Sequence, residues 1–132
     1  MNIHQKRKYA QLAFSWCKEN FKPSKFTEGV PKLIIRKKGI LFKGYYNQHK
    51  NIICIFLDKH NNLLDICNTV IHEWKHYQQN PEIYLKYRSK YKKSLNGHPH
   101  EISARKFAEK YSRVCKQEIE KIYRSEIIKD VY

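Results

Sequence analysis

The chain has little that would place it in a membrane or outside the cell. Its 132 residues contain no apolar run close to the roughly eighteen residues that span a bilayer. The basic segment 1–8 is not followed by an uninterrupted apolar stretch, so it does not resemble a signal peptide. No CxxC pair occurs among the scattered cysteines, which are Cys17, Cys54, Cys67 and Cys115. Because each falls on an apolar stripe or strand, we expect core thiols in a reducing, cytoplasmic compartment.

Acidic residues are scarce as well. The chain has 12 Asp and Glu against 27 Lys and Arg, which gives a net charge of +15 and a pI near 9.7. Such a balance can attract nucleic acid or an acidic protein, although the cations are spread along the whole chain. The densest basic group is interleaved with Tyr84, Tyr87 and Tyr91, and it consists of Lys86, Arg88, Lys90, Lys92 and Lys93. We favour an amphipathic helix that buries the tyrosines over a nucleic-acid surface on which bases stack.

The composition is that of a folded protein. Hydrophobic residues make up 41% of the chain and aromatic residues 14%, which argues against intrinsic disorder. No internal repeat, low-complexity tract or flexible linker is visible. We therefore expect residues 1–132 to form one domain with a modest core, and we expect no membrane partner.

Hydrophobic spacing and turn residues predict an α+β fold. The expected elements are a helix over 3–20, a loop over 21–31, and strands over 32–38, 40–46 and 52–57. Gly39 marks a turn between the first two strands, and the polar residues 46–51 mark the next turn. Helices are expected from Asn62 onward, from Pro81 to about residue 94, and from Pro99 to about residue 128. The order predicts an N-terminal helix, a small three-stranded and mostly antiparallel sheet, and C-terminal helices.

The most informative segment is the HExxH motif, which runs from His72 to His76 within the helix expected after Asn62. On a helix, positions four apart share a face, so both imidazoles point the same way. Two imidazoles on one face can hold one zinc ion, and Glu73 between them can take a proton from a zinc-activated water. A purely structural metal site would have no use for this glutamate.

The residues around the motif favour a metal site over two unrelated histidines. Asn62 is expected to cap the helix with its side chain, and the Asp65 side chain is expected to bond back to the backbone of Asn62, as in a capping box. A buried apolar stripe at helical spacing is predicted for Leu64, Cys67, Ile71 and Trp74. His72 and His76 fall beside this stripe, so we expect them to be half sheltered from solvent.

A catalytic zinc site needs a third protein ligand, which must come from further along the chain. The longer motif HExxHxxGxxH is absent, because Gln79 occupies the glycine position and no histidine follows three residues later. Pro99 suits the start of a new helix, and Glu101 then heads a stripe of Ala104, Ala108, Tyr111 and Cys115. Small residues would let this helix approach the motif closely, and a carboxylate is rarely buried without a partner. We favour Glu101 as the ligand over a mere helix-dipole effect, with His98 or His100 as competing choices.

These residues carry a resemblance to a known group of enzymes. The layout of HExxH, a spacer and Glu-x-x-Ala-x-x-Phe-Ala resembles the gluzincin-type minimal metallopeptidases. It is most similar to ImmA/IrrE-type domains and to single-domain minigluzincins, including phage and mobile-element members. The resemblance covers about residues 30 to 111. It implies a zincin-like zinc peptidase with one Zn²⁺ held by His72, His76 and Glu101; the neighbouring SprT-like proteases use a third histidine instead.

The resemblance also implies a mechanism. In similar zincins an edge strand before the metal helix pairs with the extended substrate, and residues 52–57 are expected in that role. Glu73 would act as general base on the activated water and pass the proton to the leaving amine. Tyr91, His98 and His100 are candidates for substrate or transition-state contacts, although His98 could equally cap a helix. The alternative function is a basic module that binds nucleic acid or an acidic protein and carries a vestigial or structural metal site.

Overall fold

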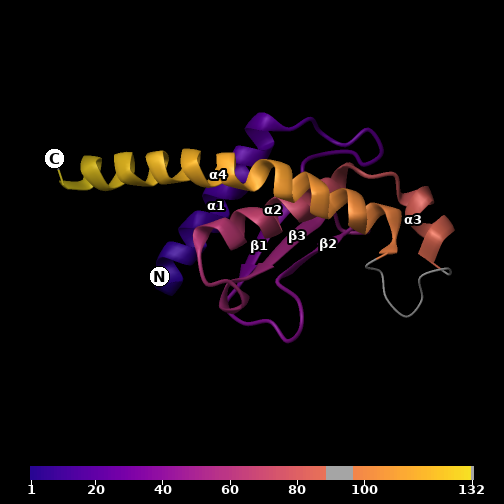
Figure 1. The fold of residues 1–132 in the computed structure, drawn as a ribbon, viewed down its shortest axis with the longest axis horizontal. Helices are drawn as coiled ribbons and strands as arrows, with labels where there is room; N and C mark the ends of the chain where they lie inside the picture. Colours follow the sequence, from indigo (N-terminus) through magenta and orange to yellow (C-terminus); the bar gives the residue numbers. More distant parts are fainter. Residues whose placement is uncertain (89–96, 132) are drawn as a thin grey trace.

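The computed structural model describes residues 1–88 and 97–131, and it confirms the predicted α+β class (Figure 1). Within these ranges the elements follow in the order α1 (Ile3–Asn20), β1 (Lys32–Arg36), β2 (Gly44–Asn47), β3 (Ile52–Phe56), the short 3₁₀ helix η1 (Leu57–Lys59), α2 (Leu63–Gln78), α3 (Pro81–Arg88) and α4 (Pro99–Val131). The helices start close to where capping residues and prolines predicted them. None of the helices in the described ranges is long and apolar enough to cross a bilayer.

Side-chain caps fix the starts of the first two long helices. At α1, Asn2 and Gln5 form a full capping box, each side chain bonding the other residue's backbone N–H. At α2, the Asn62 side chain accepts from the backbone N–H of Asp65, as predicted. The Asp65 side chain was expected to bond back to the backbone of Asn62. Its carboxylate instead accepts a bond from Lys43 Nζ at 2.6 Å. This bond ties the loop before β2 to the first turn of α2.

The sheet is mixed, so the prediction of a mostly antiparallel sheet is wrong. Its strand order is β1-β3-β2, with β1 parallel and β2 antiparallel to the central strand β3. The prediction that residues 52–57 form an edge strand is wrong for the same reason. Residues 53–55 are fully buried, and a continuous apolar strand of this kind belongs in the middle of a covered sheet. The strand expected over 40–46 is shorter and begins at Gly44, and Gly39 lies in a loop rather than in a tight turn between paired strands.

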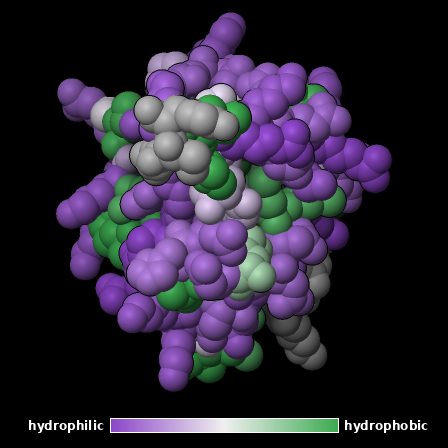
Figure 2. Space-filling view, turned by 90° about the vertical axis from the view of Figure 1, so that its left-hand side faces the viewer, coloured by the Kyte–Doolittle hydropathy of each residue, from purple (hydrophilic) through white to green (hydrophobic). Residues whose placement is uncertain are grey.

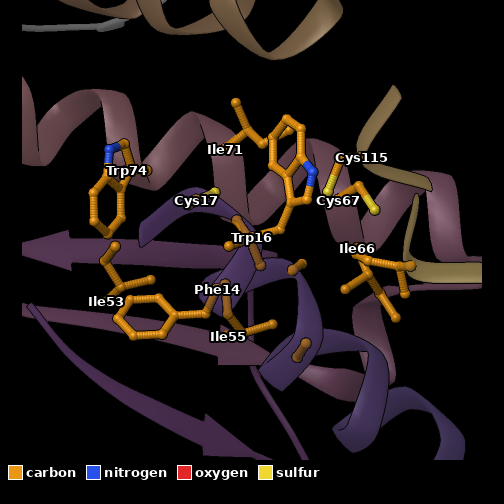
Figure 3. Packing of buried hydrophobic residues seen from close by; sticks show 14 of the residues in the cluster. Phe14, Trp16, Cys17, Ile53, Ile55, Ile66, Cys67, Ile71, Trp74 and Cys115 are labelled. Atoms are coloured by element: carbon orange, nitrogen blue, oxygen red, sulfur yellow. The ribbon is translucent and has the colours of Figure 1, made fainter. Parts of the chain in front are cut away.

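Helix α2 lies between the sheet and α4, and it is buried on most of its surface (Figure 1). Cys67, Ile71 and Trp74 are buried as predicted, whereas Leu64 is only half-buried. Figure 3 shows how side chains from α1, β3 and α4 meet those of α2. The labelled residues are Phe14, Trp16 and Cys17 from α1, Ile53 and Ile55 from β3, Cys115 from α4, and Ile66, Cys67, Ile71 and Trp74 from α2. The position of the metal motif is therefore fixed by the core itself.

The four cysteines are free and buried, so the prediction of core thiols is confirmed. Cys67 on α2 and Cys115 on α4 lie close together (Figure 3). A hydrogen bond with Cys67, together with burial, raises the pKa of the Cys115 thiol far above its ordinary value. Thiols in this state are not reactive nucleophiles, and they act here as small apolar groups where the helices meet.

Helix α4 approaches α2 closely through its small residues. Ala104 and Ala108 are fully buried, as the predicted stripe required. Further along, Tyr123 packs edge-on against Tyr9, and Glu126 pairs with Lys8 of α1. The C-terminal part of α4 extends beyond the sheet (Figure 1), and the surface on that side of the molecule is mostly hydrophilic with scattered apolar patches (Figure 2).

The densest basic group can be followed only in part. Helix α3 is described to Arg88, and the remainder of the helix expected to about residue 94 lies outside the described residues, together with Lys90, Tyr91, Lys92 and Lys93. Tyr84 and Tyr87 are half-buried and their rings lie against His98, while Lys86 is exposed. The described part of the group therefore matches the amphipathic-helix interpretation.

Candidate metal centre

The HExxH residues occupy the last two turns of α2. His72, Glu73 and His76 each offer one ligand atom, and these atoms lie within 4.8 Å of one another. The histidine side chains retain 19% and 17% of their exposure, so they are half sheltered as predicted. This group could hold a metal ion, with one side of it open to solvent.

Glu101, in the first turn of α4, brings its carboxylate to both imidazoles. Its Oε1 lies 2.7 Å from His76 Nε2 and its Oε2 lies 3.2 Å from His72 Nε2. The two Nε2 atoms are 3.2 Å apart. Ligands about 2.0–2.1 Å from a tetrahedral zinc ion are separated from each other by about 3.3 Å. The two imidazoles and the Glu101 carboxylate are therefore close enough together to share one metal ion.

The charges of these side chains stabilise one another. Burial alone would raise the pKa of Glu101, but hydrogen bonds from His72 and His76 hold it well below its ordinary value. Burial alone would lower the pKa of His76, but the hydrogen bond to Glu101 and the charge of Glu73 raise it. The contact of His76 Nε2 with Glu101 Oε1 is an ion pair when His76 is protonated, and the direction of both pKa shifts favours that state. A divalent cation would replace that proton and satisfy the same carboxylate.

Glu73 has a different environment from Glu101. Its side chain is only 7% exposed, and burial raises its pKa, partly offset by the nearby imidazoles and reinforced by Glu101. It lines the same cleft as His76 and Glu101. A carboxylate with a raised pKa is a stronger base than an ordinary one, which suits it to accept and return a proton.

Gln79 supports the site from the end of α2, and sequence reasoning missed this role. Its side-chain oxygen accepts a bond from His76 Nδ1 at 2.7 Å, which directs Nε2 toward Glu101. Its amide group donates to the backbone carbonyl of His100 at 2.9 Å. One side chain thus orients a ligand on α2 and ties α2 to the first turn of α4. The available signal was its spacing, three residues after His76 at a helix end.

Both ring nitrogens of His98 form hydrogen bonds outside the group of His72, Glu73 and His76, which argues against its choice as a metal ligand. Its ring is fully buried, with Nδ1 accepting from the backbone N–H of His100 and Nε2 donating to the carbonyl of Tyr84. Its own carbonyl accepts from Ile102 N–H, so His98 caps α4, which was its simpler interpretation. It positions Glu101 indirectly, because Glu101 lies in the turn that this cap starts.

His100 remains beside the cleft as a candidate for substrate contact. Its ring lines the cleft together with Glu101 and stacks against Tyr84 with an interplanar angle of 26°. Burial lowers its pKa, and the charges of His98 and His76 act in the same direction. Tyr91, the third candidate for such contacts, lies outside the described residues.

The cleft in front of the site has a volume of about 540 Å³. Strand β2 and the turn after it form one wall, and the ends of α2, α3 and α4 form the other; the lining residues that bear on the argument are Phe42, Gly44, Glu73, His76, Tyr84 and Glu101. Because β2 is at the end of the sheet order, its outer edge has no strand partner within the described residues. The edge strand at this site is therefore β2 and not the segment 52–57.

Comparison of the chain with family models, curated proteins and solved structures found no match. The resemblance to gluzincin-type peptidases therefore stays a prediction from the motif. What the molecule itself provides is an α+β frame with two histidines and a glutamate on one helix that could hold a metal ion.

Proposed function

We propose that the protein is a zinc-dependent metallopeptidase. The observation that carries this proposal is the convergence of His72, His76 and Glu101 from two helices, with Glu73 buried beside them at the base of a cleft. Two imidazoles and one carboxylate with an open fourth position are a donor set typical of hydrolytic zinc sites. Zinc bound there would polarise a carbonyl group and acidify a water molecule.

Glu73 is the general base in this proposal. Its raised pKa lets it accept a proton from the attacking water and later donate it to the amine that leaves. His72, His76 and Glu101 hold the metal, and Gln79 keeps the His76 ring in the required orientation. His100 is a candidate donor toward the negative charge that develops on the attacked carbonyl group.

The substrate is an extended segment of polypeptide. An extended chain can add to the open edge of β2 through main-chain hydrogen bonds, with little demand on its sequence. This places the scissile bond in the cleft between β2 and the helix ends. Pairing with the substrate, which was expected of residues 52–57, is therefore assigned to β2 in this proposal.

The alternative is a basic binding module whose metal site is vestigial or structural. It is favoured by the net charge of +15 and by a second groove lined by Lys75, Lys106 and Lys110 beside the apolar floor of Phe107. Nucleic acid or an acidic protein would then bind in a salt-sensitive manner. Such binding would survive Glu73→Gln unchanged, and with a vestigial metal site the purified protein would contain no stoichiometric zinc.

Metal analysis combined with a cleavage assay tests the proposal. We expect one zinc per chain in protein purified without chelators, cleavage of an unfolded labelled protein such as casein, and loss of both in His72→Ala. Glu73→Gln should keep the zinc and lose cleavage. Glu101→Ala should reduce the zinc content; an unchanged content would leave His100 as the remaining candidate for third ligand. Exposed His4 and Glu19 provide matched controls, because His4→Ala and Glu19→Gln should change neither quantity.

A further inference from the structure

Three consecutive large apolar residues stand in solvent between β1 and β2. Ile40 is 92% exposed, Leu41 80% and Phe42 66%. We call these three residues the apolar loop; the connection that carries them protrudes at the bottom of the view in Figure 1. Single exposed apolar side chains are common, but a contiguous run of this kind normally marks a surface that binds something.

The backbone holds the apolar loop in this exposed position. At its start, Gly39 N–H donates to Asp58 Oδ1 and Asp58 N–H donates to the carbonyl of Lys37. At its end, Phe56 N–H donates to the carbonyl of Lys43. Gly39 also lies so close to the Phe56 ring that an added methyl carbon would be 2.5 Å from Cγ, so only glycine fits there. The start of the loop is therefore fastened to Asp58 in η1, and its end to Phe56, the last residue of β3.

The apolar loop is continuous with the candidate site. Phe42 lines the same cleft as Glu73 and His76, and the chain passes directly from it through Lys43 into β2. A polypeptide paired with the outer edge of β2 would therefore meet Phe42 at one end of the strand. Leu41 and Ile40 come immediately before Phe42 in the chain, so the exposed apolar surface continues beyond that end of the strand.

We propose that the apolar loop is a substrate subsite that takes large apolar side chains of an extended polypeptide on one side of the cleaved bond. This proposal rests on the proposed peptidase function and names its substrate class: unfolded or extended segments that carry residues such as Leu, Ile or Phe near the scissile bond. Covering the loop removes exposed apolar surface from water on both partners. Substrates with such residues should be preferred by about tenfold or more over alanine analogues.

The position of Phe42 favours a substrate over the other surfaces that an exposed apolar loop can contact. A bilayer or a second copy of the chain that buried Phe42 would cover one end of the cleft. A substrate strand buries the same side chain while it occupies the cleft. Binding to vesicles and self-association are therefore the competing outcomes of the test.

A peptide series provides the experiment. Quenched fluorescent peptides with an alanine host sequence carry a single Leu, Phe or Ser at each of the three positions on either side of the cleaved bond. We expect the zinc-loaded wild-type protein to prefer Leu and Phe at one or two positions on one side only. The triple variant Ile40→Ser/Leu41→Ser/Phe42→Ser should lose this preference, mainly through a higher KM for the apolar peptides. Ile127→Ser/Ile128→Ser, which alters exposed apolar residues at the far end of α4, is the matched control and should retain it.

A binding assay separates failure of this proposal from failure of the proposed function. Fluorescence anisotropy with zinc-loaded Glu73→Gln protein measures peptide affinity without cleavage, and the apolar peptide should bind about tenfold more tightly than the alanine peptide only when the loop is intact. If the wild-type protein cleaves nothing, the peptidase proposal fails, whereas the anisotropy result still decides the role of the loop. Equal affinity of both peptides would overturn the subsite. So would loop-dependent binding to vesicles of neutral and anionic phospholipid, or loop-dependent dimers in sedimentation, without a peptide preference.

Discussion

Gln79 provides the sharpest test of how the site is built, because its side-chain amide forms hydrogen bonds with His76 of α2 and with His100 of α4. Gln79→Leu keeps a similar volume and removes the bonds to His76 Nδ1 and to the His100 carbonyl. Each hydrogen bond contributes about 0.5–1.5 kcal/mol net, so the two together are worth about 1–3 kcal/mol. At 1.4 kcal/mol per factor of ten, this corresponds to about a 5- to 140-fold weaker metal affinity. The usual loss when a group behind a ligand is removed, about 10- to 100-fold, lies within this range.

The assay is competition for zinc against a fluorescent chelator, with wild-type protein and variants side by side. Gln79→Glu separates the two bonds: it keeps an acceptor for His76 but removes the donor to the His100 carbonyl. We expect Gln79→Glu to lose less zinc affinity than Gln79→Leu, because it retains the bond to His76, and to unfold at a lower temperature without metal. Gln78→Leu is the matched control, because the side-chain amide of Gln78 donates to the Lys22 carbonyl at 2.7 Å and not to a residue of the site. A zinc affinity of Gln79→Leu within twofold of the wild type would refute the supporting role.

Three further predictions follow from the buried groups around the site. In metal-free protein, the raised pKa of Glu73 means that the folded state loses stability as pH rises above 4.5, the ordinary pKa of a glutamate. Glu73→Gln should therefore stabilise the fold increasingly from pH 4.5 toward neutrality. Denaturant unfolding at several pH values measures this, and a pH-independent difference would contradict it. Ala108→Leu should destabilise the protein by about 1–3 kcal/mol and lower its zinc content, because the added bulk separates α4 from α2; a normal zinc content would contradict the close-packing argument. His98→Ala should cost about 0.5–2 kcal/mol through loss of the α4 cap, measured by thermal unfolding, and a variant as stable as wild type would show that the cap contributes nothing.

The helices and the ligand faces were predictable because they depend on local spacing. His72 and His76 share a face whatever surrounds the helix, and Asn62 and Pro99 mark helix starts through backbone chemistry alone. The position of the Glu101 carboxylate beside the two histidines was predictable, because a carboxylate at the head of a stripe of small residues needs a partner. The identity of the metal and the reaction stay predictions, since they depend on chemistry that spacing does not determine.

The sheet was harder to predict because strand order is set by long-range pairing. Residues 40–42 have the apolar character of a strand, yet the backbone bonds of Gly39 and Lys43 hold them in solvent. The run 52–57 was recognised as the strongest strand, but nothing local shows that it pairs with a strand on each side. Gln79 was missed because a polar residue at a helix end has many uses, and only the fold shows that His100 lies opposite.

The burial of α2 has a consequence for how this molecule can change over time. His72, Glu73 and His76, which could hold a cation, lie on a helix embedded in the middle layer, where many alterations would disturb folding. The parts that would select a ligand, namely β2, the apolar loop and α3, lie at the periphery and carry few core side chains. Mutations there can accumulate without weakening the scaffold, so the surface around the cleft can diverge, or be redesigned, while the group that could hold a metal is inherited intact.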